Sequence, residues 1–361
     1  MQLDFLRHLY QRPLGCASVY LDITRADATA REQIALRWRA AREELAKSRV
    51  DGATLDALDE LITGPAHNAR GIAAFARDGD VVFARPMPEP PRQEIARYAP
   101  LPHLMPMLAQ SPPEVPHLRV SADRAGGELV EVLGQYQTAP TRVDGEGWPV
   151  HKTSVGGWSQ NRYQRSAEEA WRENEKEFAA AVTTAAERIG AELIMLAGDT
   201  KARGLLLDHL GRPWADKVVV VEKEVPADSA ELAQAAGKEI RSRAEQAARE
   251  RLDTFRTRRA HDRAAEGFSD VVARLRDTQV ADLLLADDPS STAKLWFGPD
   301  VTQAGTTDGE VRERGAAEPA CDRADAVLVR ELVLTGAELH FLPEGEAPPR
   351  DGIAALLRFA Y

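Results

Sequence analysis

Cysteine is scarce in this chain, with only Cys16 and Cys321 among 361 residues. Two cysteines exclude a disulfide framework, and the eight histidines show no spacing typical of a zinc cluster. Cys16 lies in an apolar stretch, which favours a buried thiol over a nucleophile. The 25 glycines and 22 prolines are too few for a collagen-like or disordered chain. The sequence therefore predicts a globular protein that folds without covalent or metal cross-links.

Long hydrophobic runs and an excess of positive charge are also missing. No stretch approaches the roughly 18 apolar residues that span a bilayer, and charged residues interrupt the first thirteen positions, unlike a secretory signal. The 46 lysines and arginines stand against 57 acidic residues, a net charge of −11. Non-specific DNA binding depends on summed positive charge and is therefore disfavoured. We expect a cytoplasmic protein that binds neither membranes nor DNA, although a locally basic surface is compatible with this balance.

Common enzyme motifs are absent as well. The sequence contains no phosphate-binding G-x-x-x-x-G-K-[ST], no strand leading into G-x-G-x-x-G, no H-E-x-x-H and no G-x-S-x-G. Asp123 and Asp199 follow predicted strands, where carboxylates of a ribonuclease-H-like sheet could bind a metal. A turn at Asp123 and a helix cap at Asp199 explain both positions more simply. We therefore predict no metal site and no cofactor.

Hydrophobic periodicity divides the chain into three domains of mixed α/β class. Residues 1–113 form an N-terminal α/β domain, and ten of the 22 prolines, between Pro86 and Pro116, form a linker over its surface. Its predicted elements are a strand at 16–23, helices at 29–48 and 55–62, and a hairpin at 71–84. Residues 267–361 form a C-terminal α/β sandwich. Its predicted elements are strands at 280–286, 293–297, 337–341 and 353–359 and helices around 271–275 and 324–335.

The middle domain, residues 114–266, has the element order of a ribonuclease-H-like fold. Three extended stretches come first, followed by helices that alternate with buried strands. The predicted strands are 117–122, 128–133, 135–143, 193–197 and 217–221. The predicted helices are 166–189, opened by capping-box spacing at Ser166, then 203–210 and 229–266.

A polar segment of the middle domain, HKTSVGGWSQNRYQR at 151–165, carries the functional signal. It contains three cations and no acid. Its glycine pair permits unusual backbone angles, and its two aromatic residues follow no apolar periodicity. These features suit single-stranded RNA and its phosphates. The predicted RNA-binding residues are Lys152, Gly156, Gly157, Trp158, Ser159, Arg162, Tyr163 and Arg165.

The run Gly156-Gly157-Trp158-Ser159-Gln160, followed by Arg162 and Arg165, resembles the Gly-Gly-Gln loop of archaeal and eukaryotic peptide-chain release factors. The N-terminal α/β unit and the ending GIAALLRFAY are similar to the bacterial branch of this release factor and Pelota superfamily, which includes Balon-like ribosome hibernation factors. Two residues separate the glycine pair from Gln160, and the first domain has no Asn-Ile-Lys-Ser motif. The resemblance therefore implies a factor that does not read stop codons.

Three functions are compatible with this resemblance. The first is a ribosome A-site factor that places residues 151–165 near the peptidyl transferase centre and protects idle ribosomes, with elongation factor Tu as a partner. The second is ribosome rescue by peptidyl-tRNA hydrolysis, in which Gln160 positions the attacking water. The third is cleavage of the tRNA acceptor end, arranged by Gln160 and Arg162. All three imply contacts with ribosomal RNA or tRNA.

Overall fold

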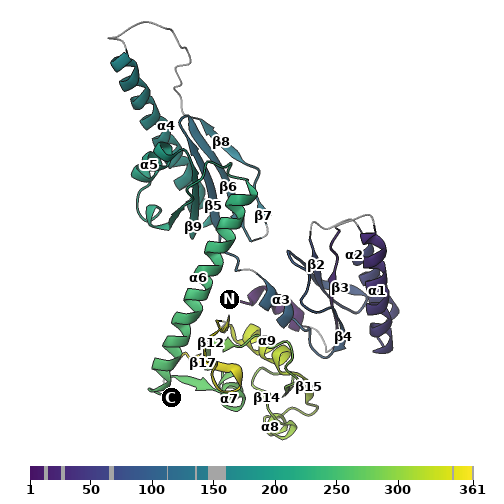
Figure 1. Cartoon of the computed structure of the whole chain (residues 1–361). Coiled ribbons are helices and arrows are strands. Elements are labelled where there is room, and N and C mark those ends of the chain that lie inside the picture. The colour runs from purple at the N-terminus through teal and green to yellow at the C-terminus, as the bar shows by residue number, and fades with distance from the viewer. Residues whose placement is uncertain are drawn as a thin grey trace. The chain divides into compact units, whose positions relative to one another are not determined.

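The computed structural model describes residues 1–11, 15–25, 29–64, 69–111, 113–134, 136–144, 160–343 and 345–359, with the backbone alone over 160–171. The chain forms two compact units (Figure 1). Unit 1 combines Met1–Ser111 with Gln246–Tyr361, and unit 2 is Pro112–Glu245. The predicted mixed α/β class is confirmed. The first and third predicted domains thus fall within one unit.

The N-terminal part of unit 1 is an antiparallel sheet with the order β3-β2-β1-β4. Val19 of β1 packs toward the helices α1 and α2, whereas the next residue, Tyr20, packs on the opposite face. This alternation follows the two-residue period of a strand and explains why both faces of the sheet are covered. The elements are the 3-10 helix η1 (Asp4–Tyr10), β1 (Cys16–Asp22), α1 (Ala30–Lys47), α2 (Gly52–Thr63), β2 (Gly71–Arg77), β3 (Asp80–Met87), β4 (Ile95–Ala99) and α3 (Met105–Gln110).

The proline-rich stretch is part of this fold, so its prediction as a surface linker is wrong. Strand β4 pairs with β1 at the edge of the sheet, and α3 buries Met105, Met107 and Leu108. Pro106 lies in the first turn of α3, where a missing amide breaks no helical hydrogen bond. A high density of prolines therefore does not by itself indicate a linker. Here a strand and a helix form between prolines, because Pro106 stands where the helix needs no backbone donor.

The C-terminal part of unit 1 has two small sheets, with the orders β11-β17-β12-β16 and β14-β13-β15. The predicted helix at 324–335 is confirmed, and Gly336 ends it in the left-handed conformation at φ 67°. The elements are β11 (Ala264–Glu266), α7 (Phe268–Arg276), β12 (Val280–Leu285), β13 (Lys294–Phe297), β14 (Ala304–Gly305), α8 (Asp308–Glu313), β15 (Ala320–Arg323), α9 (Ala324–Thr335), β16 (Glu338–Phe341), the 3-10 helix η3 (Arg350–Gly352) and β17 (Ile353–Leu357).

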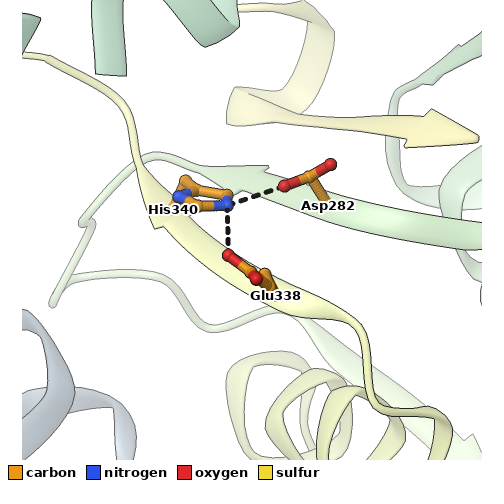
Figure 2. A group of neighbouring side chains, drawn as sticks. All are labelled: Asp282, Glu338 and His340. Atoms are coloured by element: carbon orange, nitrogen blue, oxygen red, sulfur yellow. Dashed lines mark hydrogen bonds and ion pairs between the residues drawn. The ribbon is translucent and has the colours of Figure 1, made fainter. Parts of the chain in front are cut away.

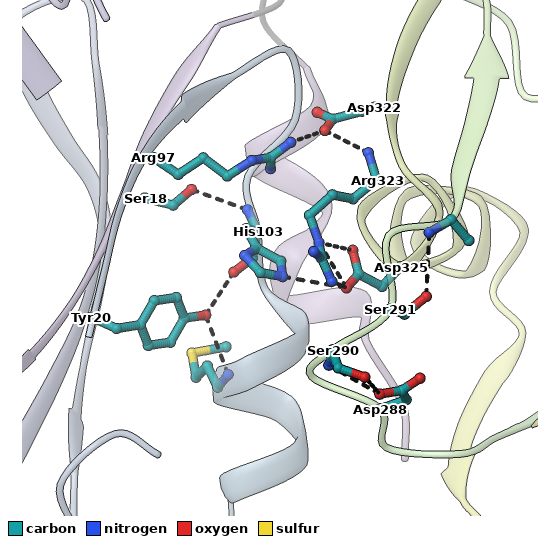
Figure 3. A network of polar contacts seen from close by, with 12 residues as sticks. Ser18, Tyr20, Arg97, His103, Asp288, Ser290, Ser291, Asp322, Arg323 and Asp325 are labelled. Carbon is teal, nitrogen blue, oxygen red and sulfur yellow. Dashed lines mark hydrogen bonds and ion pairs between the residues drawn. The ribbon is translucent and has the colours of Figure 1, made fainter. Parts of the chain in front are cut away.

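A polar network joins the two parts of unit 1 (Figure 3). The hydroxyl of Tyr20 donates to the carbonyl of His103 at 2.7 Å, and His103 Nε2 lies 3.3 Å from Asp325 Oδ2. Asp322 accepts from Arg97 and, at 2.9 Å, from the amide of Leu101. The contacts of Asp322 and Asp325 join residues more than 200 positions apart in sequence. Single-sequence periodicity therefore could not reveal that the two parts share a core.

Unit 2 is built on a sheet with the order β10-β9-β5-β6, in which β7 and β8 both pair with β6. Strands β5, β6 and β8 are antiparallel neighbours, whereas β9 and β10 run parallel to β5. This arrangement matches the element order predicted for the middle domain. The strands are β5 (His117–Asp123), β6 (Gly126–Leu133), β7 (Tyr136–Gln137), β8 (Thr141–Asp144), β9 (Leu193–Gly198) and β10 (Val218–Val220).

Helices cover both faces of this sheet. On one face lie α4 (Gln160–Ile189) and α5 (Thr200–His209), and on the other lies the first part of α6 (Ala230–Arg259). A short 3-10 helix, η2 (Ala215–Lys217), precedes β10. Within the part of the chain that the structure describes, no helix is long and apolar enough to cross a membrane.

Two helix boundaries differ from the sequence prediction by six residues or more. Helix α4 begins at Gln160 rather than at Ser166, because residues 160–165 contain no glycine or proline that would prevent the helix from extending. Helix α6 ends at Arg259 rather than near Glu266, because residues 264–266 pair with β17 as β11. In the second case a tertiary contact overrides a local preference for helix.

Candidate functional site

The catalytic candidate and the predicted RNA-binding residues fall into two groups. Gln160, Arg162, Tyr163 and Arg165 occupy the first turns of α4, so they belong to a helix rather than to a loop. Arg162 and Arg165 are three residues apart and therefore share one side of that helix. The remaining candidates lie outside the described residues: Lys152, Gly156, Gly157, Trp158 and Ser159.

The rest of α4 is held firmly on the sheet. Its buried face includes Phe178, Val182 and Ile189, which pack into the core of unit 2. Gly127 permits a close approach, because a Cβ atom there would lie 2.3 Å from the ring of Phe178. Figure 1 shows α4 running past the end of the sheet, so its first turns stand clear of the strands. The packed half of α4 thus fixes the direction in which the arginine-bearing turns project.

Asp123 ends strand β5 and holds the turn that follows, as predicted. Its Oδ1 accepts from the amide of Ala125 at 2.8 Å, and Arg142 of β8 donates to both of its carboxylate oxygens, at 2.5 and 3.2 Å. Burial opposes ionisation, but these hydrogen bonds outweigh it and lower the pKa of Asp123. Asp123 is therefore a charged group at the end of the central strand.

Asp199 stands beside Asp123, because its amide donates to the carbonyl of Ala122 at 3.0 Å. Its Oδ1 caps α5 by accepting from the amides of Lys201 and Ala202, at 3.0 and 3.2 Å, which confirms the predicted cap. Its Oδ2 accepts from Arg124 at 3.4 Å. An open cleft of about 510 Å³ is lined by Asp123, Arg124, Ala125 and Asp199.

Glu175 of α4 completes this group, and the sequence analysis missed it. Its side chain is 0% exposed, and neither carboxylate oxygen has a hydrogen-bond partner among the described residues. Burial, followed by the negative charges of Asp123 and Asp199, raises the pKa of Glu175 to about 8. A signal was available, because Glu175 precedes Phe178 by three residues and so lies on the predicted apolar face of the helix.

A second cluster lies in unit 1, where β12 and β16 pair in parallel (Figure 2). Nε2 of His340 is 2.8 Å from Asp282 Oδ1 and 3.4 Å from Glu338 Oε2. The amino group of Met1 lies 3.5 Å from Glu338, and Arg251 lies 3.9 Å from Asp282. These cations already compensate both carboxylates. We interpret the cluster as an ion-pair network that holds the first residue against β16.

Comparison with known proteins finds a family similar to part of this chain. Residues 116–261 match the family described as bacterial archaeo-eukaryotic release factor family 2. Two uncharacterized proteins of Mycobacterium tuberculosis, from two strains, are each 27% identical to this chain over 374 residues. The alignments cover 100% of this chain and 97% of each relative.

Two solved structures of Pelota also align with the chain. Pelota of Archaeoglobus fulgidus aligns over 82% of this chain and 82% of its own, with 15% identity and a TM-score of 0.37. A model of ribosome-bound archaeal Pelota aligns over 99% of this chain and 96% of its own, with 13% identity and a TM-score of 0.42.

Proposed function

We propose that the chain is a ribosome-associated translation factor of the archaeo-eukaryotic release factor and Pelota superfamily, and that it occupies the A site. In this proposal residues 151–165 approach the peptidyl transferase centre, and the factor protects idle ribosomes without reading a stop codon. The observation that carries the proposal is the family match over 116–261, which includes this segment and the whole of α4.

The charge distribution supports an RNA contact at this place. The chain carries a net charge of −11, so attraction to RNA has to come from a local surface. Arg162 and Arg165 share one side of the first turns of α4, beyond the part of the helix that packs on the sheet. Two arginines spaced three residues apart at the start of a helix suit the phosphates of an RNA backbone.

The spacing of the motif favours protection over peptide release. Hydrolysis of peptidyl-tRNA needs a water-positioning group placed to within about an ångström. Two residues separate the glycine pair from Gln160, and Gln160 is the first residue of α4. Occupation of the A site tolerates such a change, whereas catalysis does not. Delivery by elongation factor Tu and action in the cytoplasm are parts of the same proposal.

Ribosome binding is tested with the double charge reversal Arg162→Glu and Arg165→Glu. We expect binding to purified ribosomes to weaken by roughly 100-fold or more at low salt, and the slope of log K against log salt to fall by about two. The matched control is Arg172→Glu with Lys176→Glu, which reverses two exposed cations farther along α4. Equal affinities of the arginine variant and the wild type, at unchanged melting temperature, would contradict the proposal.

Chemistry is tested on ribosomes that carry labelled peptidyl-tRNA in the P site. We expect the wild type to bind without releasing peptide and without shortening the tRNA. Peptide release that disappears in Gln160→Ala would replace protection by rescue hydrolysis. Loss of the tRNA 3′ end would instead identify acceptor-end cleavage. Either result would overturn the protective role while leaving the ribosome as the partner.

A further inference from the structure

Three side chains that can bind a metal meet on one face of a sheet in unit 1. Asp282 of β12 pairs with Glu338 of the parallel strand β16, and Leu284 pairs with His340. Because alternate residues of a strand share a face, this register places Asp282, Glu338 and His340 on the same face. Paired strands hold such groups more rigidly than loops do. Asp282 and His340 are 58 positions apart in sequence, so the sequence analysis, which predicted no metal site, could not reveal the group.

The three ligand atoms lie at separations that fit one ion. Nε2 of His340 is 2.8 Å from Asp282 Oδ1 and 3.4 Å from Glu338 Oε2, and all three atoms lie within 4.8 Å of one another. Ligand atoms around a tetrahedral zinc ion, each about 2.0–2.2 Å from the metal, are roughly 3.4 Å apart. Figure 2 shows both carboxylates directed toward the same ring nitrogen. An ion beside that nitrogen therefore has all three groups within reach.

The contacts that hold the two carboxylates without a metal are loose. Nε2 of His340 carries one hydrogen at most, so it makes a good hydrogen bond to Asp282 and leaves Glu338 at 3.4 Å without one. The amino group of Met1 lies 3.5 Å from Glu338 and donates to a backbone carbonyl instead. Arg251 lies 3.9 Å from Asp282, beyond hydrogen-bond distance. Partly exposed pairs of this kind contribute little, so an ion can displace them at small cost.

We infer that Asp282, Glu338 and His340 form a binding site for one divalent transition-metal ion of the Zn²⁺ class. An imidazole nitrogen with two carboxylate oxygens is a donor set that Zn²⁺ accepts, whereas Mg²⁺ and Ca²⁺ select oxygen ligands alone. Three protein ligands leave a fourth position for water, and the two carboxylate side chains are 25% and 35% exposed, so water reaches it. Without the ion, the cluster is the ion-pair network described above, in which Met1 and Arg251 supply the positive charge.

The inference is tested on the untagged full-length protein with Zn²⁺ as the probe, by isothermal titration calorimetry near neutral pH after removal of bound metal with a chelator. We expect one ion per chain in the wild type and no competition by millimolar Mg²⁺. His340→Gln should weaken binding by at least about tenfold, the loss typical even of a group that only supports a metal ligand. His261→Gln, which removes an exposed imidazole of the same unit, is the matched control and should bind as the wild type does.

Two further variants keep the test decisive. Glu338→Gln changes the most exposed of the three ligands, should weaken binding in the same way, and replaces His340→Gln should that variant fail to fold. Asp123→Asn alters a carboxylate of unit 2 and should leave Zn²⁺ binding unchanged. The inference is overturned if the wild type binds no Zn²⁺ at submillimolar concentration, if the folded ligand variants bind as the wild type does, or if His261→Gln weakens binding as much as they do. Because the assay contains no ribosomes, its result is independent of the proposed ribosomal function.

Discussion

Buried acidic side chains are treated differently in the two units. In unit 1, Glu331 is 1% exposed and its Oε1 accepts from Arg330, which also donates to the carbonyls of Gly298 and Pro299 at 2.9 Å. In unit 2, Glu175 is 0% exposed and has no hydrogen-bond partner within the described residues. Burial raises the pKa of both groups, to about 7 for Glu331 and to about 8 for Glu175. Only the first has a local cation to offset that cost.

Asp325 of unit 1 extends the contrast. Burial alone would raise its pKa, but hydrogen bonds and charge from His103 and Arg323 outweigh burial and hold that pKa well below the usual range. In unit 1 both acids therefore have partners that belong to the fold. Unit 2 keeps a buried acid whose partner the described residues do not supply. Such a group lowers stability without a structural return, which favours a role in binding.

The largest expected effect is that of breaking the partnered acid in unit 1. Arg330→Met leaves Glu331 buried without its cation and removes two donors from backbone carbonyls. We expect the free energy of unfolding to fall by about 3–5 kcal/mol in urea titrations at pH 7. The double variant Arg330→Met and Glu331→Leu should recover most of this loss, because it removes the uncompensated charge as well. A single variant as stable as the wild type would show that the pair contributes nothing.

The sequence revealed the features of this contrast that depend on local pattern. The turn at Asp123, the cap at Asp199 and the helix at 324–335 follow from side chains that act on their own neighbourhood. The burial of Arg330 and Glu331 could not be predicted from the sequence, because two adjacent charged residues in a helix are usually exposed. Glu175 was visible as an acid on an apolar face, but its isolation depends on strands 18 or more residues away on either side.

In the rest of the molecule, too, some features could be predicted from local sequence and others could not. A glycine pair followed by glutamine and two arginines is a local signature, and it predicted a resemblance to release factors that the family match over residues 116–261 supports. The start of α4 at Gln160 was missed because a capping box is only a local preference. The proline-rich stretch was misjudged because composition does not show which amides a sheet requires.

An intermediate effect on stability is expected from Asp325→Asn, and it should depend on pH. The unfolded Asp325 takes up a proton near pH 4, whereas the folded one does so only well below that pH. Its ionised form therefore stabilises the wild type above about pH 4, and this contribution is lost as pH falls further. We expect the variant to lose roughly 2 kcal/mol at pH 7 and the two stability curves to converge toward pH 2.

The control for this prediction is Asp4→Asn, because Asp4 pairs with Arg7 at an exposed position. That variant should stay within about 0.5 kcal/mol of the wild type at every pH, as exposed pairs contribute little. Parallel curves for Asp325→Asn and the wild type down to pH 2 would mean that the contacts of Asp325 with His103 and Arg323 do not favour its ionised form.

The smallest expected effect on stability is that of Glu175→Gln. Its sign tells whether Glu175 of unit 2 lacks the kind of partner that Glu331 of unit 1 has. The amide has nearly the shape of the carboxyl group, so packing against Phe178 and the sheet is preserved, while the desolvated acid is removed. At pH 8 we expect the variant to be as stable as the wild type or more stable by about 1 kcal/mol. Differential scanning calorimetry of both proteins measures this difference in stability, with Glu177→Gln as the control for a change of charge on the same helix.

A loss of 2 kcal/mol or more, far outside the usual range for a substitution at a site without partners, would mean that Glu175 is held by a contact like that of Glu331. Unit 2 would then treat its buried acid as unit 1 does.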